Sequence, residues 1–121
     1  MKEIILVGTG GFIGASLRYL TSTWLTQFNR FGFPVGTFSV NFIGCILLGV
    51  FVGLGLEKKS TLPLQDFVAI GVLGGFTTFS TFGLESFEML QTGHFKMTAI
   101  YVLGSIVLGI SGIGLGLFIT R

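Results

Sequence analysis

The chain has 121 residues, of which 50% are hydrophobic and 10% charged, and its net charge is +2. A soluble domain is about a quarter charged, so this composition excludes an ordinary soluble enzyme and a disordered tail. It also excludes a nucleic-acid binder, because the seven Lys and Arg residues are scattered rather than clustered. A single cysteine, Cys45, allows neither a disulfide framework nor a cysteine metal site within one chain.

Apolar runs separated by polar residues predict four membrane-spanning helices in a single transmembrane domain, residues 1–121. A helix needs about 20 mostly apolar residues to cross the hydrocarbon core of a bilayer. Four runs meet this length, at residues 4–25, 33–56, 67–88 and 97–120. Between the runs, polar residues together with Pro63 and Gly93 are typical of helix ends. The predicted fold class is therefore an all-α membrane protein that crosses the membrane several times.

Four spans place both termini on the same side of the membrane, and the basic residues are almost evenly divided between the two sides. One side carries Lys2, Lys58, Lys59 and Arg121, and the other carries Arg18, Arg30 and Lys96. A strong excess of Lys and Arg on the cytoplasmic side normally fixes the orientation of a membrane protein. The excess of Lys and Arg on one side of this chain is weak, so two interpretations of its orientation remain open. Either the chain inserts in both orientations and forms an antiparallel homodimer, or lipids and the insertion machinery impose one orientation.

The first apolar run contains a glycine-rich stretch with two interpretations. The spacing of Gly8, Gly11 and Gly14 is similar to that of a dinucleotide-binding turn. Such a turn needs an acidic residue about 20 positions later, and residues 26–35 contain none. Gly10 and Gly14 are instead spaced as small residues that let two membrane helices pack closely.

Two polar residues within the spans are candidate functional residues, because a polar group at membrane depth is costly without a partner. Arg18, late in the first span, either reaches the membrane interface with its long side chain or attracts anions in a water-filled vestibule. Asn41, near the middle of the second span, either hydrogen-bonds to a neighbouring helix or offers its amide NH2 group as a neutral donor to an anion.

The middle of the third span contains paired glycines followed by clustered hydroxyl residues. Glycine and threonine are weak helix formers, so we predict a break in this helix near residues 74–78. A break frees backbone groups at membrane depth, which is tolerated where they line a cavity or bind an ion. With no carboxylate at mid-membrane, a cation there would be held by carbonyl oxygens. The alternative is a kink whose freed backbone groups are met by the hydroxyls of Thr77, Thr78, Ser80 and Thr81.

Phe79 and Phe82 lie three residues apart and so share one face of the resumed helix. Phenylalanine on such a face usually packs against neighbours. Its ring edge is electropositive, however, so two edges turned to a pathway can coordinate an anion without a formal charge that would trap it. Together with Asn41 these rings would form a weak, multi-site anion route. Tyr101 and Ser105, one turn apart in the fourth span, would continue a polar track, although Tyr101 is also typical of an interface anchor.

Two acidic residues, Glu85 and Glu88, end the third span. We interpret them as interfacial anchors, with a role at a pore mouth or in proton transfer as the alternative. His94 lies in a predicted loop and has no paired base, nucleophile or metal ligand, so the sequence gives no support for an enzyme.

Three sequence runs closely resemble the CrcB-type, or Fluc, fluoride channels. They are GGFIGASLRY at 10–19, GTFSVNFIG at 36–44 and GGFTTFSTF at 74–82. The third run is long and highly specific, and the similarity in order and spacing extends over essentially the whole chain. The resemblance implies a dual-topology, antiparallel homodimer in the cell inner membrane, with two fluoride pores and a structural sodium ion (Na+) at its centre. It further implies that fluoride leaves the cell passively, which reduces fluoride toxicity.

The resemblance also implies roles for individual residues. Phe79 and Phe82 would be the pore phenylalanines whose edges face fluoride, and Asn41 would be the pore amide. Gly74 and Thr77 would give backbone carbonyls to sodium, two from each chain. Further members of the ion pathway would be Ser80, Thr81, Tyr101 and Ser105, with Arg18 near a vestibule.

Two other functions are each distinguished from that of a fluoride channel by one feature of the sequence. A small dual-topology multidrug or cation exporter needs a carboxylate within its first span, and the only acid near that span is Glu3 at its end. A structural membrane subunit needs no helix break with clustered hydroxyls.

The similarity to the fluoride channels departs at Gly109 and at Gly112 or Ile113, where relatives can carry further hydroxyls. The expected partners are fluoride, a second copy of the chain and the lipid bilayer, with no nucleic acid.

Overall fold

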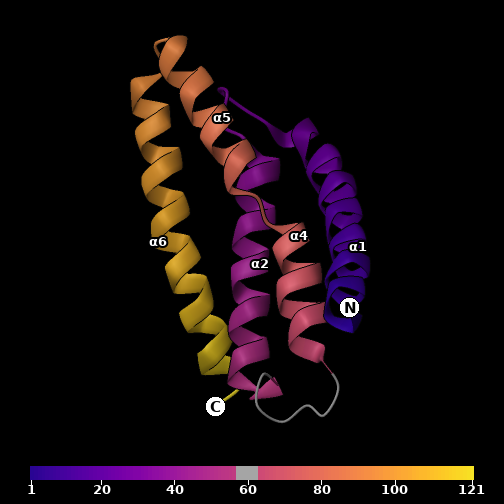
Figure 1. Ribbon diagram of the computed structural model, residues 1–121. Helices are drawn as coiled ribbons and strands as arrows, with labels where there is room; N and C mark the ends of the chain where they lie inside the picture. The colour runs from indigo at the N-terminus through magenta and orange to yellow at the C-terminus, as the bar shows by residue number, and fades with distance from the viewer. Residues whose placement is uncertain (57–62) are drawn as a thin grey trace.

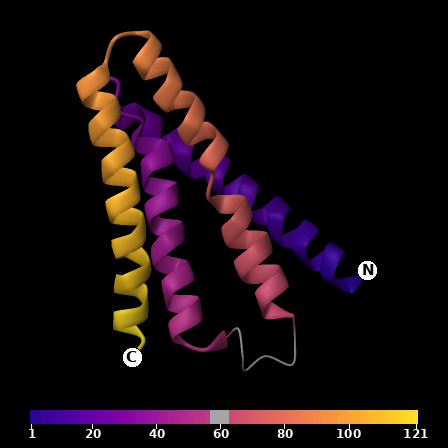
Figure 2. The ribbon, with the colours of Figure 1, turned by 60° about the vertical axis from the view of Figure 1, so that its left-hand side comes forward.

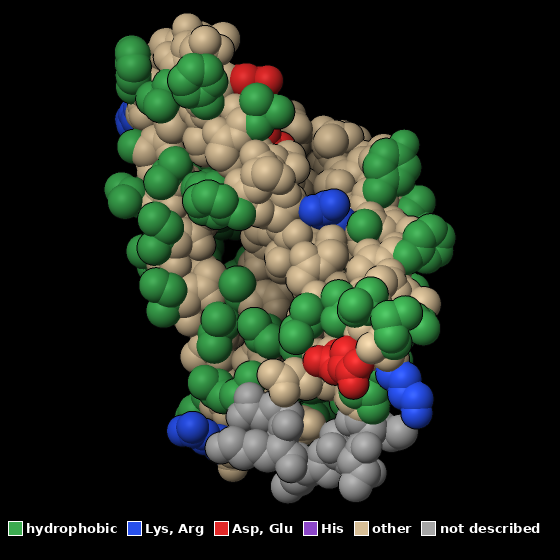
Figure 3. Space-filling model, in the orientation of Figure 1, with side chains coloured by type: hydrophobic (Ala, Val, Ile, Leu, Met, Phe, Trp, Pro, Cys, Tyr) green, Lys and Arg blue, Asp and Glu red, His purple; other side chains and the backbone are tan. Residues whose placement is uncertain are grey.

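The computed structural model describes residues 1–56 and 63–121, which form long helices arranged side by side (Figure 1). Four helical stretches are long and apolar enough to cross a membrane: Lys2–Phe28, Val35–Gly53, Gln65–Gln91 and Phe95–Ile119. Hydrophobic side chains spread over the face in Figure 3, and charged side chains gather mostly toward its two ends. The all-α class and the four spans predicted from the sequence are confirmed for the described residues.

Proline and glycine set the helix ends. The helices outside the third span are α1 (Lys2–Leu25), continued by the short 3-10 turn η1 (Thr26–Phe28), α2 (Val35–Gly53) and α6 (Phe95–Ile119). Helix α2 begins directly after Pro34, which lacks the backbone N–H that a helix interior needs. It ends before Gly55, whose φ of 66° is left-handed. The expected span 33–56 was therefore too long at both ends. Gly93, with φ 79°, likewise forms the turn before α6.

The third span is divided into two helical halves. The first half consists of η2 (Gln65–Leu73), a π-helix, and α4 (Gly74–Phe76), and the second half is α5 (Phe79–Gln91). Between them the backbone of Thr77 and Thr78 is extended, with φ/ψ of −86°/159° and −149°/124°. The break predicted near residues 74–78 is confirmed, but it lies at the end of that range. Gly74 and Gly75 are helical, so the extended residues are the two threonines and not the paired glycines.

Gly75, together with Gly10 and Gly14 on α1, instead allows α1 to pack directly on the first half of the third span. A Cβ atom on Gly75 would lie 2.7 Å from the carbonyl oxygen of Gly11, and one on Gly14 would overlap the carbonyl oxygen of Val72. A Cβ on Gly10 would collide with the carbonyl oxygen of Phe67. The close packing predicted for Gly10 and Gly14 is confirmed, and small residues on both helices are its cause.

Substituting Gly14 with alanine should destabilise the folded protein. The added methyl group meets the backbone of the neighbouring helix, which cannot move aside as a side chain can, so we expect a loss of about 1–3 kcal/mol or more. Thermal unfolding in detergent measures the effect. Gly8→Ala is the matched control on α1, because nothing lies within 4 Å of a Cβ there. Equal unfolding temperatures for the two variants would contradict this packing.

The broken span changes its packing partner at the break. Its first half, η2 and α4, packs on α1, whereas α5 lies against α6, which in turn packs along α2 (Figures 1 and 2). The extended residues Thr77 and Thr78 therefore lie between helices and not at a membrane surface. Lys58 and Lys59, which entered the expected charge balance, lie outside the described residues.

A single chain has a small core and a large apolar surface. Among the described residues, only Tyr101 and Val40 are large side chains with essentially no exposed surface, while Phe79 and Phe118 are 83% and 80% exposed. An apolar surface of this kind is suited to contact with lipid or with another membrane protein chain.

Candidate functional site

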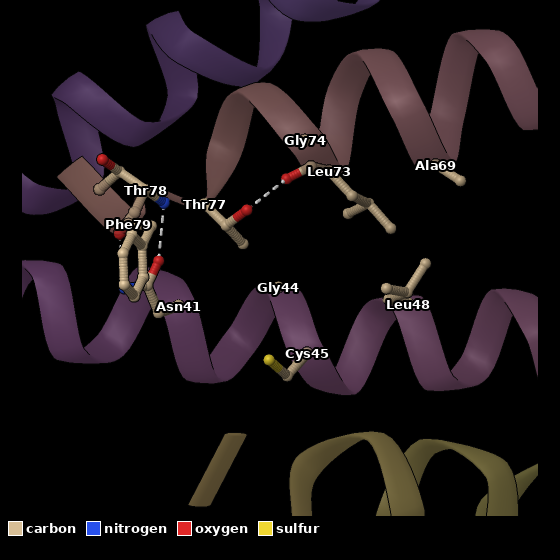
Figure 4. Close-up of a pocket in the computed structure, with 10 residues that line it drawn as sticks. All are labelled: Asn41, Gly44, Cys45, Leu48, Ala69, Leu73, Gly74, Thr77, Thr78 and Phe79. Atoms are coloured by element: carbon tan, nitrogen blue, oxygen red, sulfur yellow. Dashed lines mark hydrogen bonds between the residues drawn. The ribbon is translucent and has the colours of Figure 1, made fainter. Parts of the chain in front are cut away.

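The amide side chain of Asn41 on α2 holds the extended backbone of Thr78. Its Nδ2 donates to the Thr78 carbonyl oxygen at 3.0 Å, and the Thr78 N–H donates to its Oδ1 at 2.8 Å (Figure 4). Asn41 thus replaces the helical hydrogen bonds that the break removes from Thr78. The helix-to-helix interpretation of Asn41 is confirmed. Because an amide nitrogen carries two hydrogens, the second one remains suitable for an anion.

The hydroxyl groups of the break bond to neighbouring atoms. The Thr78 hydroxyl accepts from the Thr81 N–H at 3.2 Å, which caps the start of α5, and donates to Thr81 Oγ1 at 3.1 Å. Ser80 Oγ lies 3.3 Å from the same Thr78 hydroxyl, and Thr77 Oγ1 donates to the Leu73 carbonyl at 3.1 Å. The break therefore combines an extended backbone with hydroxyls that satisfy freed groups. Ser80 and Thr81 as pathway residues stay predictions.

Arg18 lies at the break and not at a helix end. Its half-buried guanidinium donates from Nη1 to the carbonyl oxygen of Thr77 at 3.2 Å. The side chain lines a cavity of about 190 Å³, together with Ala15, Tyr19, Ser22, Thr37, Val40, Thr78 and Thr81. This position favours the cavity interpretation of Arg18 over the interface interpretation.

The two residues expected to hold sodium, Gly74 and Thr77, line a second cavity of about 310 Å³ (Figure 4). The other lining residues are Asn41, Gly44, Cys45, Leu48, Ala69, Leu73, Thr78 and Phe79. A Cβ on Gly74 would meet only the Ala69 carbonyl oxygen, at 3.7 Å, so the backbone of Gly74 is open to this cavity. Carbonyl oxygens suit a hard cation, and the Thr77 carbonyl keeps a lone pair beside the one that Arg18 uses. The residues present therefore fit a sodium ion, although two carbonyls need further ligands.

Aromatic rings form a continuous row beside the break. The centroids of Phe79 and Phe82 lie 5.6 Å apart, and that of Phe82 lies 5.1 Å from that of Tyr101. Tyr101 is 0% exposed and also meets Phe33 edge-on at 5.4 Å. The structure therefore brings together the two phenylalanines and the tyrosine that the sequence placed in separate spans.

Glu85 was missed as a site residue. Its two carboxyl oxygens accept hydrogen bonds of 2.7 Å each, one from the Thr37 hydroxyl on α2 and one from the Tyr101 hydroxyl on α6. The carboxylate of Glu85 therefore joins α5 to α2 and α6. Tyr101 has no exposed surface, which disfavours its interpretation as an interface anchor. A usable signal existed, since Glu85 and Tyr101 lie eight residues before and after Gly93. Positions equally distant from a tight turn lie at about the same height along an antiparallel helix pair.

Ser105 lies one turn beyond Tyr101 on α6. Its hydroxyl oxygen is buried, and it has no hydrogen-bond partner within residues 1–56 and 63–121. Buried hydroxyls are normally satisfied, so this one is free to meet a ligand or water. Its place in a polar track stays a prediction.

These features define a small multi-pass membrane protein with polar groups gathered at a broken helix. The family model described as "CrcB-like protein, Camphor Resistance (CrcB)" matches residues 5–117. The chain therefore belongs to the CrcB family, and the resemblance seen in its sequence is confirmed.

Several proteins named "Fluoride-specific ion channel FluC" are similar over all or most of their length. The one from Phocaeicola vulgatus is 42% identical over 121 residues, which cover all of both chains. The one from Agrobacterium fabrum is 38% identical, covering 100% of this chain and 98% of its own. The one from Helicobacter pylori is 41% identical, covering 93% of this chain and 88% of its own.

Proposed function

We propose that this protein is a fluoride-selective ion channel of the cell membrane, through which fluoride leaves the cell passively. It works as a channel and not as an enzyme, and its activity reduces fluoride toxicity. The observation that carries the proposal is the full-length similarity to proteins named fluoride-specific ion channels. The position of the polar groups supports it, because they gather at the break between the halves of the third span.

The ion pathway runs along the row formed by Phe79, Phe82 and Tyr101. Fluoride is strongly hydrated, so a pathway must replace its water by donors that do not hold it too tightly. The electropositive ring edges, the second N–H of Asn41 and the unpartnered hydroxyl of Ser105 are neutral donors of this kind. No formal positive charge is needed along this row.

The functional unit is an antiparallel, dual-topology homodimer with a sodium ion at its centre. Three observations support this assembly. Phe79 is 83% exposed in one chain, which is unfavourable for a pore residue unless a second copy covers it. Gly74 and Thr77, the two residues expected to give carbonyls to sodium, both line the 310 Å³ cavity, and a second copy would complete the cation's ligands. The nearly even distribution of basic residues is compatible with insertion in both orientations.

A flux assay on liposomes that contain the purified protein tests the function. Fluoride and chloride electrodes record release after the membrane potential is clamped with an ionophore, and empty liposomes are the control. We expect fast fluoride release with chloride retained. Equal release of both anions would contradict selectivity, and release of neither would favour a structural subunit. Proton-driven uptake of an organic cation would favour the exporter.

Gly74→Ala should impair dimer assembly while one chain still folds. The methyl group has room within the chain, where its nearest contact is 3.7 Å from the Ala69 carbonyl oxygen. At the centre of a dimer it would separate the carbonyls that share the sodium ion. Crosslinking and size-exclusion chromatography in sodium and in choline measure the dimer fraction. Gly114→Ala on α6, where nothing lies within 4 Å, is the control, and a fully dimeric Gly74→Ala protein would contradict the assignment.

A further inference from the structure

Two cavities adjoin the extended backbone at the break of the third span. One is the 310 Å³ cavity with the carbonyl-bearing residues Gly74 and Thr77. The other is the 190 Å³ cavity lined by Arg18 and by several hydroxyls. Thr78 lines both. Groups suited to a cation and a group suited to an anion thus both lie at this short extended segment.

The guanidinium of Arg18 reaches this extended segment without a carboxylate partner. Within the described residues the only ion pair joins the N-terminal ammonium of Met1 to Glu3, so no acid neutralises Arg18 there. Its charge is permanent, because arginine does not lose its proton in proteins. Arg18 Nη1 donates a hydrogen bond of 3.2 Å to the Thr77 carbonyl oxygen. This bond fixes the direction of the Thr77 carbonyl, which lies in the extended segment and outside both helices.

We propose that Arg18 is a positioning residue that sets how strongly the break binds a cation. The proposal rests on the carbonyl cation site of the proposed function. Arg18 uses one lone pair of the Thr77 carbonyl and leaves the other for the cation, so the two positive charges share one oxygen. The hydrogen bond orders the carbonyl, which favours binding, and the like charge opposes binding. Because the site is partly shielded from water, the repulsion exceeds the gain from ordering.

The test is a sodium titration of thermal unfolding for the purified full-length protein, with choline chloride holding ionic strength constant. For Arg18→Gln we expect a lower unfolding temperature without sodium, because the break has lost its hydrogen bond. We also expect the half-saturating sodium concentration to fall by about tenfold, because the repulsion between unit charges this close is removed. Arg18→Lys keeps the charge and should keep a sodium requirement close to that of the unchanged protein. Arg18→Met provides a second neutral side chain of similar length if the glutamine variant does not fold.

Arg30→Gln is the matched control, because Arg30 is exposed in the segment between η1 and α2 and lies outside both cavities. It should leave the titration unchanged. If sodium stabilises the original protein but the neutral variants show the same half-saturating concentration, the role of Arg18 is overturned while the cation site stands. If sodium has no effect on the original protein, the cation site fails and this proposal fails with it.

Discussion

Phe79→Ile or Phe82→Ile should each abolish fluoride release from liposomes while the protein remains folded. Isoleucine retains the apolar bulk of the residue but has no electropositive ring edge, so on the proposed pathway fluoride would lose a ligand where its hydration water has been removed. We expect the release rate to fall by about a hundredfold or more, equivalent to about 3 kcal/mol at the barrier to permeation. The liposome assay with a fluoride electrode measures this directly.

Phe87→Ile is the matched control, since Phe87 lies on the same helix α5, is 57% exposed and is not part of the aromatic row. It should leave the rate within a few-fold of the original. Size-exclusion chromatography must show the same elution volume for all three variants and the original protein. Unchanged fluoride release in both Phe79→Ile and Phe82→Ile would remove these residues from the pathway and leave them as packing residues.

Glu85→Ala should both destabilise the protein and slow fluoride release. The substitution leaves the hydroxyls of Thr37 and Tyr101 without an acceptor, and both residues are buried. Each unsatisfied group costs about 1–3 kcal/mol, so we expect a total loss of about 2–6 kcal/mol in unfolding free energy. The Tyr101 ring, which packs on Phe82 at 5.1 Å, would then lose its fixed orientation beside the pathway.

A second variant separates stability from permeation. Glu85→Gln keeps an acceptor oxygen and the same shape, so it should be more stable than Glu85→Ala when unfolding is followed in detergent. Glu88→Gln, one turn further along α5 and exposed, is the control and should behave like the original in both assays. If Glu85→Ala matches Glu88→Gln in stability and in flux, the hydrogen bonds to Thr37 and Tyr101 contribute to neither property.

The spans and the break follow from local properties of the sequence. Apolar runs of bilayer length predict the helices because each helix satisfies its own backbone in lipid, whatever its neighbours are. The weak helix propensity around residues 74–78 likewise predicts a break. Its position at Thr77 and Thr78 was not predictable from propensity, because two glycines precede it that are weaker helix formers. Gly75 lies in the helical half that packs on α1, and Asn41 holds Thr78, the second extended residue.

The candidate site shows the same division between local and tertiary causes. The sequence identified Asn41 as a polar residue that is costly in lipid, and helical spacing identified Phe79 with Phe82 and Tyr101 with Ser105 as candidates for one pathway. It could not pair Arg18 with the Thr77 carbonyl or Glu85 with Thr37, because these partners lie 59 and 48 residues apart along the chain. What the sequence determined is which residues are costly in a membrane. The packing of the helices decided which of them meet, because a hydrogen bond depends on distances of about 3 Å that only the tertiary structure sets.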